Sequence, residues 1–244
     1  MFNTLSEISH TNSDKRTYQP DEGLPLPVNK VGIEIEMEGI KSTSALNVVS
    51  QSGYWKLESD NSLRGTGIEL ISVPMFGKDI EQALDVVEGF FKKAKYLPTF
   101  NARTSLHVHV EVVDLSREEL IRFILLYCAV EPLLFNFCEK SRRDNVYCLP
   151  VHTVESVKRR TAELITFLEA GDRRGVQSLL KGWPKYAALN LNNITGIGTA
   201  EFRQLHGTVD KHEILTWVKL LLSIKRFAVT DMAKYNDFPE IVSG

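Results

Sequence analysis

The segment VGIEIE at residues 31–36 alternates apolar and acidic side chains, which is the pattern of a β-strand with one apolar and one polar face. Glu34 and Glu36 share the polar face, because successive side chains of a strand point to opposite sides of the sheet. A charge in an otherwise apolar strand is unfavourable unless it is paired or binds a ligand. We therefore interpret this strand as part of a sheet whose polar face carries a functional site.

Three more segments combine an apolar strand pattern with carboxylates, imidazoles or a guanidinium. They are IELISVP at 68–74, LHVHV at 106–110 and TAEFR at 199–203. His107 and His109 share one face of their strand, and Glu201 and Arg203 share one face of theirs. Glu69 has an apolar neighbour on either side. These side chains extend the polar face predicted for 31–36.

Three of the four segments, taken alone, also have a purely structural explanation. The glutamates of 31–36 can lie on a solvated edge, the histidines of 106–110 can be half-buried structural residues, and Glu201 can form a salt bridge with Arg203 along its strand. Glu69 is harder to explain in this way, because apolar residues surround it, and each segment would need an explanation of its own. A single site on one face of a sheet accounts for all four segments.

The remaining chain predicts an α+β fold. We expect strands near 31–39, 54–58, 67–73, 105–113, 186–192 and 198–205, and helices near 78–95, 116–137, 155–169, 173–180 and 212–232. Ser116 with Glu119, and Asp210 with Glu213, have the spacing of a capping box at a helix start, and Pro132 is expected to bend its helix. The sequence has neither regular strand–helix alternation nor a glycine-rich phosphate loop. We therefore expect a curved, mainly antiparallel sheet with helices packed on the side opposite the polar face.

The polar, proline-containing residues 1–29 predict a loosely ordered N-terminal leader. We expect residues 30–235 to form a single catalytic domain and residues 236–244 to form a C-terminal tail.

The composition is that of a globular protein, with 43% hydrophobic and 25% charged residues among 244. The formal net charge of -2 argues against tight binding to nucleic acid. Cys128, Cys138 and Cys148 lack a metal-binding spacing and are expected to be free thiols. We expect no signal peptide and no apolar run of the roughly 20 residues that a membrane span needs. These features predict a cytoplasmic protein with no membrane partner, and the apolar helices leave a homo-oligomer open.

The spacing of the acidic residues favours two metal ions over one. Glu34 and Glu36 are about 6.6 Å apart along an extended strand, at about 3.3 Å per residue. One Mg²⁺ cannot readily bind both at its usual distance of about 2.1 Å, whereas two neighbouring ions can bind one each. Glu69, Glu201 and one histidine supply further ligands, and Arg203 can face phosphate oxygens.

Six motifs in order along the chain resemble the amidoligase family, which belongs to the carboxylate–amine ligase superfamily of glutamine synthetase and glutamate–cysteine ligase. The motifs are GIEIE at 32–36, the series Asp60, Ser62, Glu69 and Pro74, HVHV at 107–110, SRRDNVYC at 141–148, KYAALNLN at 185–192 and GTAEFRQLHGTVD at 198–210. The resemblance covers nearly all of 31–230. His206 and the absence of a glycine just before His107 depart from the pattern that we expect for the family.

The resemblance implies a fold like the catalytic domain of glutamine synthetase and an ATP-dependent ligase that activates a carboxylate as an acyl phosphate. It implies Mg²⁺ or Mn²⁺ as two or more ions, with the ligands Glu34, Glu36, Glu69, His107 and Glu201. Arg203, Glu36 and Glu201 are the implied catalytic residues, and His109, also implied, would contact phosphate or substrate. The polar residues Lys185 and Asn190, which precede the last strand, are further candidates for nucleotide binding, although a structural role is equally open.

An acyl phosphate must be shielded from water, which predicts a cover over the polar face. The segment 139–153 is the expected cover, and it offers Arg142, Arg143 and Tyr147 for substrate binding. Asp60 and Ser62 are further substrate-binding candidates or simple turn residues. The acid and the amine can be small molecules, peptides or groups on a macromolecule.

Two other functions fit the same residues. A metal-dependent hydrolase or an iron enzyme can use His107, His109 and a glutamate. A binding protein without catalytic activity can retain the fold.

Overall fold

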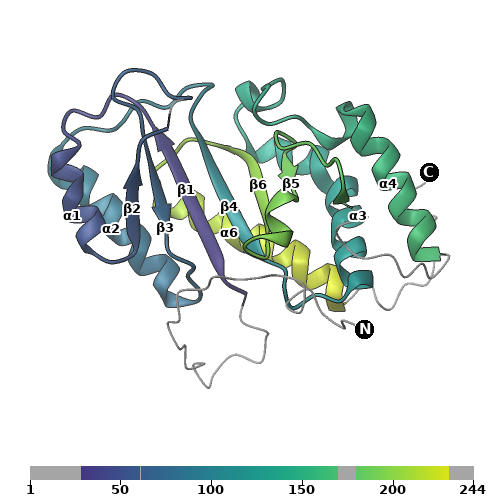
Figure 1. Ribbon diagram of the computed structural model, residues 1–244. Helices are drawn as coiled ribbons and strands as arrows, with labels where there is room; N and C mark the ends of the chain where they lie inside the picture. Colours follow the sequence, from purple (N-terminus) through teal and green to yellow (C-terminus); the bar gives the residue numbers. More distant parts are fainter. Residues whose placement is uncertain (1–28, 61, 170–179, 231–244) are drawn as a thin grey trace.

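The computed structural model describes residues 29–60, 62–169 and 180–230. Within them six strands form one sheet in the order β2-β3-β1-β4-β6-β5, and every neighbouring pair is antiparallel. The strands are β1 (Val31–Met37), β2 (Trp55–Glu58), β3 (Ile68–Ser72), β4 (Ser105–Glu111), β5 (Leu189–Asn190) and β6 (Thr199–His206). The predicted α+β fold with an antiparallel sheet is confirmed (Figure 1). The likeness to glutamine synthetase stays an expectation.

Five α-helices lie in the described part of the chain: α1 (Asn47–Gln51), α2 (Lys78–Ala94), α3 (Arg117–Leu134), α4 (Glu155–Glu169) and α6 (Lys211–Thr230). All but the short α1 are predicted from the sequence within a few residues. The predicted helix at 173–180 lies outside the described residues except for Leu180. The leader and the tail lie outside them too, except for Asn29.

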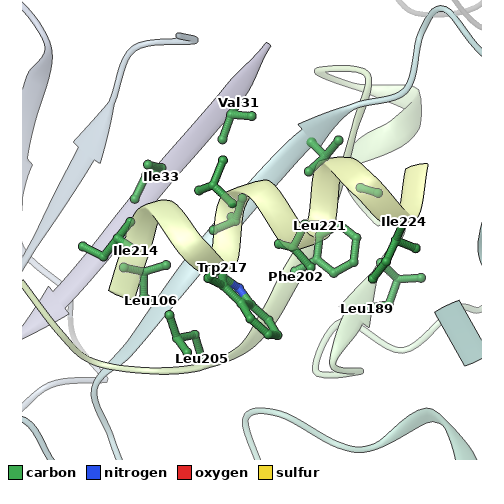
Figure 2. Packing of buried hydrophobic residues seen from close by; sticks show 14 of the residues in the cluster. Val31, Ile33, Leu106, Leu189, Phe202, Leu205, Ile214, Trp217, Leu221 and Ile224 are labelled. Carbon is green, nitrogen blue, oxygen red and sulfur yellow. The ribbon is translucent and has the colours of Figure 1, made fainter. Parts of the chain in front are cut away.

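The apolar face of the sheet packs against helices, as predicted. Figure 2 shows α6 lying across this face, with Trp217 and Leu221 close to Leu205 and Phe202 of β6. Ile33 and Phe202 are fully buried there. Burial of one such side chain contributes about 1.5–3 kcal/mol, so the apolar alternation of the strands selects this face for the core.

The helix starts follow the predicted caps only in part. The Ser116 hydroxyl accepts from the N–H of Glu119, whose carboxylate accepts from the N–H of Ser116, which confirms the capping box of α3. At α6 the Asp210 carboxylate accepts from the N–H of Glu213. The N–H of Asp210 donates to Thr208 instead, so the second half of that box differs from the prediction.

The helix Arg117–Phe137 is long and apolar enough, by length and composition, to cross a membrane. The expectation that the sequence has no such run was therefore wrong. Half of the apolar window is buried inside the protein. The helix packs against α4 and α6, and it contains a fully buried carboxylate, Glu131. These contacts are typical of a core helix. A core helix can also be long and apolar enough, by length and composition, to cross a membrane.

The register of the sheet places polar residues of different strands opposite one another. The opposed pairs are Glu36 with Glu69, Glu34 with His107, His109 with Glu201, and Asn190 with Glu201. Directly opposed side chains on one face have Cβ atoms about 4.5–5.5 Å apart. The register therefore builds a continuous polar row across five of the strands.

A β-bulge interrupts the pairing of β4 with β6. Val108 pairs with Phe202 and Leu106 pairs with Leu205, so β6 contains one residue more than β4 over this stretch. Phe202 and Leu205 both reach the core because the extra residue reverses the alternation between them. Arg203 lies directly at the bulge, on the polar side with Glu201.

Candidate active site

The polar face of the sheet borders a cavity of about 240 Å³. Its lining residues come from four strands and from the loops beside them: Glu34, Glu36, Asp60, Ser62, Glu69, Arg103, Ser105, His107, Tyr147, Lys185, Tyr186 and Arg203. Three glutamates of the predicted metal site and Arg203 are among them. A second cavity, of about 410 Å³, lies between Phe137 and the start of α6 and lacks this carboxylate cluster.

Glu34 lies between the two histidines of β4. Glu34 Oε2 is 3.0 Å from His107 Nδ1, and Glu34 Oε1 is 3.0 Å from His109 Nε2. Burial tends to raise the pKa of Glu34, but hydrogen bonds with both imidazoles outweigh burial and hold the pKa well below its usual value. Burial tends to lower the pKa of His109, but Glu34 and Glu201 raise it overall. Glu34 is therefore the ionised centre of this group.

Glu36 is held by the first residue of β4. Its Oε2 accepts hydrogen bonds from the N–H of Ser105 at 2.8 Å and from the Ser105 hydroxyl at 2.5 Å. The same hydroxyl is 2.8 Å from His107 Nε2. Ser105 thus fixes a carboxylate and an imidazole together, although the sequence motifs did not single it out.

Glu69 is the carboxylate in the least favourable surroundings. Burial raises its pKa to about 8, and the negative charges of Glu34, Glu36 and Asp60 add to the effect. Ionisation of Glu69 is therefore unfavourable here. A cation bound beside these carboxylates removes this cost, because it favours their ionised forms.

Glu201 joins β5 and β6 at the polar face. Its Oε2 accepts from Asn190 Nδ2 at 2.7 Å and from Asn193 Nδ2 at 2.9 Å, and its Oε1 pairs with the Arg203 guanidinium. Burial tends to raise the pKa of Glu201, but His107 and Arg203 lower it overall. The salt bridge between Glu201 and Arg203, which is the purely structural explanation of these two residues, is thus formed. It lies within the polar row.

Two sets of donor atoms lie close enough together to hold a metal ion. One is Glu34, His107 and Glu201, and the other is Glu36, Glu69 and His107; within each set the donor atoms lie within 4.8 Å of one another. Glu34 and Glu36 fall in different sets, as the strand spacing predicts. The oxygen-rich donors and the raised pKa of Glu69 fit divalent cations. That these residues bind metal stays a prediction.

The segment 139–153 lies beside the cavity through Tyr147. The Tyr147 carbonyl accepts from Arg203 Nε at 3.2 Å, and Asn145 Nδ2 donates to the Ala102 carbonyl at 2.6 Å. Arg142 is only 1% exposed and donates to the carbonyls of Arg203 and Gln204. Arg142 therefore supports the bulge of β6 from inside the protein.

The other predicted substrate and nucleotide residues divide into two groups. Asp60, Ser62 and Lys185 line the cavity, whereas Arg143 is exposed, donates to Asn136 Oδ1 and is not among the lining residues. Asn190 reaches the site only through its hydrogen bond to Glu201. The predicted substrate contacts of Arg142 and Arg143 stay predictions that their positions do not favour.

His206 links the end of β6 to α6. Its Nε2 is 3.0 Å from the Glu213 carboxylate, and its Nδ1 accepts from the N–H of Glu139 at 3.4 Å. These contacts explain its position after the EFR segment without a role in the cavity.

Sequence reasoning missed Arg103 and Ser105 as lining residues and Asn193 as a partner of Glu201, whereas Tyr186 lines the cavity and lies in the KYAALNLN motif. Ser105 has a detectable signal, since it precedes His107 by two residues and shares its face of the strand. Arg103 has none, because its position depends on a turn that packs against a distant loop.

A family model described as "Putative amidoligase enzyme" matches residues 27–225. The chain belongs to this family. Membership covers the whole sheet, all the residues of the polar row and most of α6, and it agrees with the resemblance found in the sequence. The description of the amidoligase family implies a ligase that forms amide bonds. No curated protein matches this amidoligase significantly.

Proposed function

We propose that this amidoligase joins a carboxylate to an amine with ATP and Mg²⁺ or Mn²⁺, through an acyl phosphate. One observation carries the proposal: Glu34, Glu36, Glu69, Glu201 and His107 gather in two adjoining donor sets beside the Arg203 guanidinium. Phosphoryl transfer depends mainly on positioning and on neutralising charge, which this arrangement can supply without a nucleophilic side chain. Divalent ions held by the two sets would neutralise phosphate oxygens and orient them.

The proposed reaction has two steps. A carboxylate oxygen of the acid attacks the γ-phosphorus of ATP, and ADP leaves. The amine nitrogen then attacks the acyl carbon, the bond from that carbon to the phosphate oxygen breaks, and phosphate leaves with its electron pair. The amine also loses a proton to a base. The products are an amide, ADP and phosphate.

Residues of the protein would orient the transferring phosphoryl group and shield the acyl phosphate from water. Arg203, fixed by Glu201 and by the Tyr147 carbonyl, would stabilise the negative charge of the transferring phosphoryl group. Asp60 lines the cavity but belongs to neither donor set, so we assign it to the amine substrate. Tyr147 and Tyr186, with ring centroids 5.8 Å apart, border the cavity and help to exclude water.

Nucleotide binding tests the proposal without knowledge of the substrates. The full chain is titrated calorimetrically with the non-hydrolysable analogue AMP-PNP, with Mg²⁺ and with EDTA. Binding that requires Mg²⁺ is expected. Absence of divalent-dependent binding contradicts the proposal.

Trapping tests the acyl phosphate itself. Hydroxylamine attacks acyl phosphates to give hydroxamates, so the protein, ATP, Mg²⁺ and hydroxylamine are incubated with each member of a carboxylic acid panel. ADP and a hydroxamate in equal amounts are expected with an accepted acid.

Metal analysis separates this proposal from a hydrolase or an iron enzyme. His109 belongs to neither donor set, and its two ring nitrogens lie beside Thr199 and Glu34. This position does not favour a two-histidine, one-carboxylate iron site. Tightly held iron or zinc without nucleotide affinity would support that alternative instead.

We also propose a cytoplasmic location. Cys128, Cys138 and Cys148 are free, and burial raises their pKa values to about 12, 12 and 11. Such thiols are protonated and unreactive at neutral pH, as is usual for structural cysteines in a reducing compartment.

A further inference from the structure

Arg103 stands on the rim of the cavity on the side of β3. It belongs to the turn before β4, and its Nη1 donates to the Ser62 carbonyl, in the loop before β3, at 2.7 Å. Lys185 and Tyr186 line the same cavity from the segment before β5. Since β3 and β5 lie on different sides of the central strands β1 and β4, the cavity has cations on two sides.

A chain of hydrogen bonds holds Arg103 in place. Its backbone N–H donates to Asn101 Oδ1 at 2.8 Å, and Asn101 Nδ2 donates to Glu38 Oε2 at 2.7 Å. The other Glu38 oxygen accepts from the N–H of Arg64 at 2.7 Å. Glu38 is only 8% exposed, so a buried carboxylate anchors both the turn of Arg103 and the loop of Ser62.

Arg103 has no carboxylate partner among the residues that the structure describes. Four carboxylates line the same cavity, yet none forms an ion pair with it. Its planar guanidinium has five N–H donors and suits two parallel hydrogen bonds to a carboxylate. A pre-positioned guanidinium with unused donors beside a cavity is arranged for an anion that comes from solution.

In the proposed function the transferring phosphoryl group lies at Arg203, so the side of the cavity toward β6 and β5 is assigned to it. Arg203 and Lys185 lie toward β6 and β5, where the phosphates of ATP have both a cation and the donor set of Glu34 and Glu201. Arg103 is left for the acid substrate. The reacting carboxylate must approach the phosphate, so Arg103 meets a different group of that molecule.

We propose that Arg103 binds a second carboxylate of the acid substrate, so that the enzyme prefers a dicarboxylic acid to the matching monocarboxylic acid. This inference rests on the proposed ligase function. It assigns to Arg103 the recognition of a substrate carboxylate that the sequence suggested for Arg142 and Arg143.

The experiment compares two series of acids on the full chain saturated with Mg²⁺ and AMP-PNP. Calorimetry measures the dissociation constants of dicarboxylates from malonate to pimelate and of monocarboxylates of equal length. At least one dicarboxylate is expected to bind about 10-fold or more tightly than its monocarboxylate, because its second carboxylate adds a charge-assisted hydrogen bond; a 10-fold ratio corresponds to about 1.4 kcal/mol. If no dicarboxylate exceeds its counterpart, the inference is wrong.

Variants of Arg103 test whether this residue causes the preference for dicarboxylic acids. Arg103→Gln should remove it and leave Mg²⁺-dependent AMP-PNP binding within about 2-fold of wild type, and Arg103→Lys should keep part of it. Arg159→Gln, which changes an exposed arginine of α4 outside the cavity, should leave both unchanged. A preference that survives in Arg103→Gln overturns the inference, and so does a loss of AMP-PNP affinity in that variant. Failure of wild type to bind AMP-PNP contradicts the proposed ligase function itself, which keeps the two failures distinct.

Discussion

Glu34 on β1 and His107 on β4 stand directly opposite each other, with Glu34 Oε2 3.0 Å from His107 Nδ1. His107 belongs to both candidate donor sets, whereas Glu34 belongs to one. The imidazole therefore lies where the two sets adjoin. Any cation that binds Glu34 competes with two imidazoles for its oxygens.

Glu36→Gln should weaken divalent cation binding by at least about 10- to 100-fold, because even residues one shell beyond a metal ligand have effects of that size. The amide oxygen can still accept from Ser105, so folding should be preserved. Electron paramagnetic resonance titration with Mn²⁺ measures the affinity. Glu58→Gln is the matched control, since Glu58 lies opposite Glu69 but pairs with Lys56 and is in neither donor set. Equal affinity in the two variants would place the metal elsewhere.

Cation binding should depend on pH through Glu69. Its pKa of about 8 without a cation means that binding must release its proton at neutral pH. Affinity for Mn²⁺ should rise between pH 6 and about pH 8 and then level off. Calorimetry in buffers of different ionisation enthalpy measures the released proton. Glu69→Gln should weaken binding and flatten this rise, and an unchanged rise in the variant would assign the proton to another group.

The raised pKa of Glu69 also makes the stability of the protein depend on pH. Its folded-state pKa lies above the ordinary value of 4.5. The contribution of Glu69 to the free energy of unfolding is therefore present below about pH 4.5 and is lost as the pH rises through about 8. The cation-free protein should therefore show a melting temperature that declines over this range more steeply than that of Glu69→Gln. Added Mg²⁺ should reduce the difference between the two proteins.

Arg203→Ala should lower ligase turnover about 1,000-fold, because a cation that stabilises the transferring phosphoryl group typically contributes 10³–10⁵. Arg203→Lys should recover only part of the activity, since lysine cannot reach Glu201 and the Tyr147 carbonyl with the same planar geometry. Steady-state kinetics with the accepted acid and amine measure the effect. Arg226→Ala, at an exposed position of α6, should behave as wild type. Full activity in Arg203→Ala would remove this residue from the mechanism.

Glu131→Ala should destabilise the protein by about 3 kcal/mol. The fully buried carboxylate accepts from the Tyr127 hydroxyl at 3.0 Å and from the N–H of Val151 at 2.8 Å, and the substitution leaves both donors without a partner. Urea denaturation measures the change. Glu155→Ala, at an exposed residue of α4 that pairs with Lys158, should change stability by less than about 0.5 kcal/mol. Similar effects in both variants would contradict the structural role of Glu131.

The faces of the strands could be predicted because side chains alternate along an extended chain. Glu34 with Glu36, and His107 with His109, were placed on common faces from spacing alone, and the structure confirms both pairs. The buried helices followed from apolar periodicity in the same way. These are local properties, set by backbone geometry within a few residues.

The order of residues along the chain is thus enough to predict which side chains share a face, the α+β class and the family. Tertiary structure decided which strands are neighbours, and hence that Glu36 meets Glu69 and that Asn190 meets Glu201. It also decided the bulge at Arg203, the burial of Arg142 and the position of Arg103 against Ser62. Arg103 and Ser62 are 41 residues apart, and contacts of that kind arise only when the whole sheet and its loops pack together.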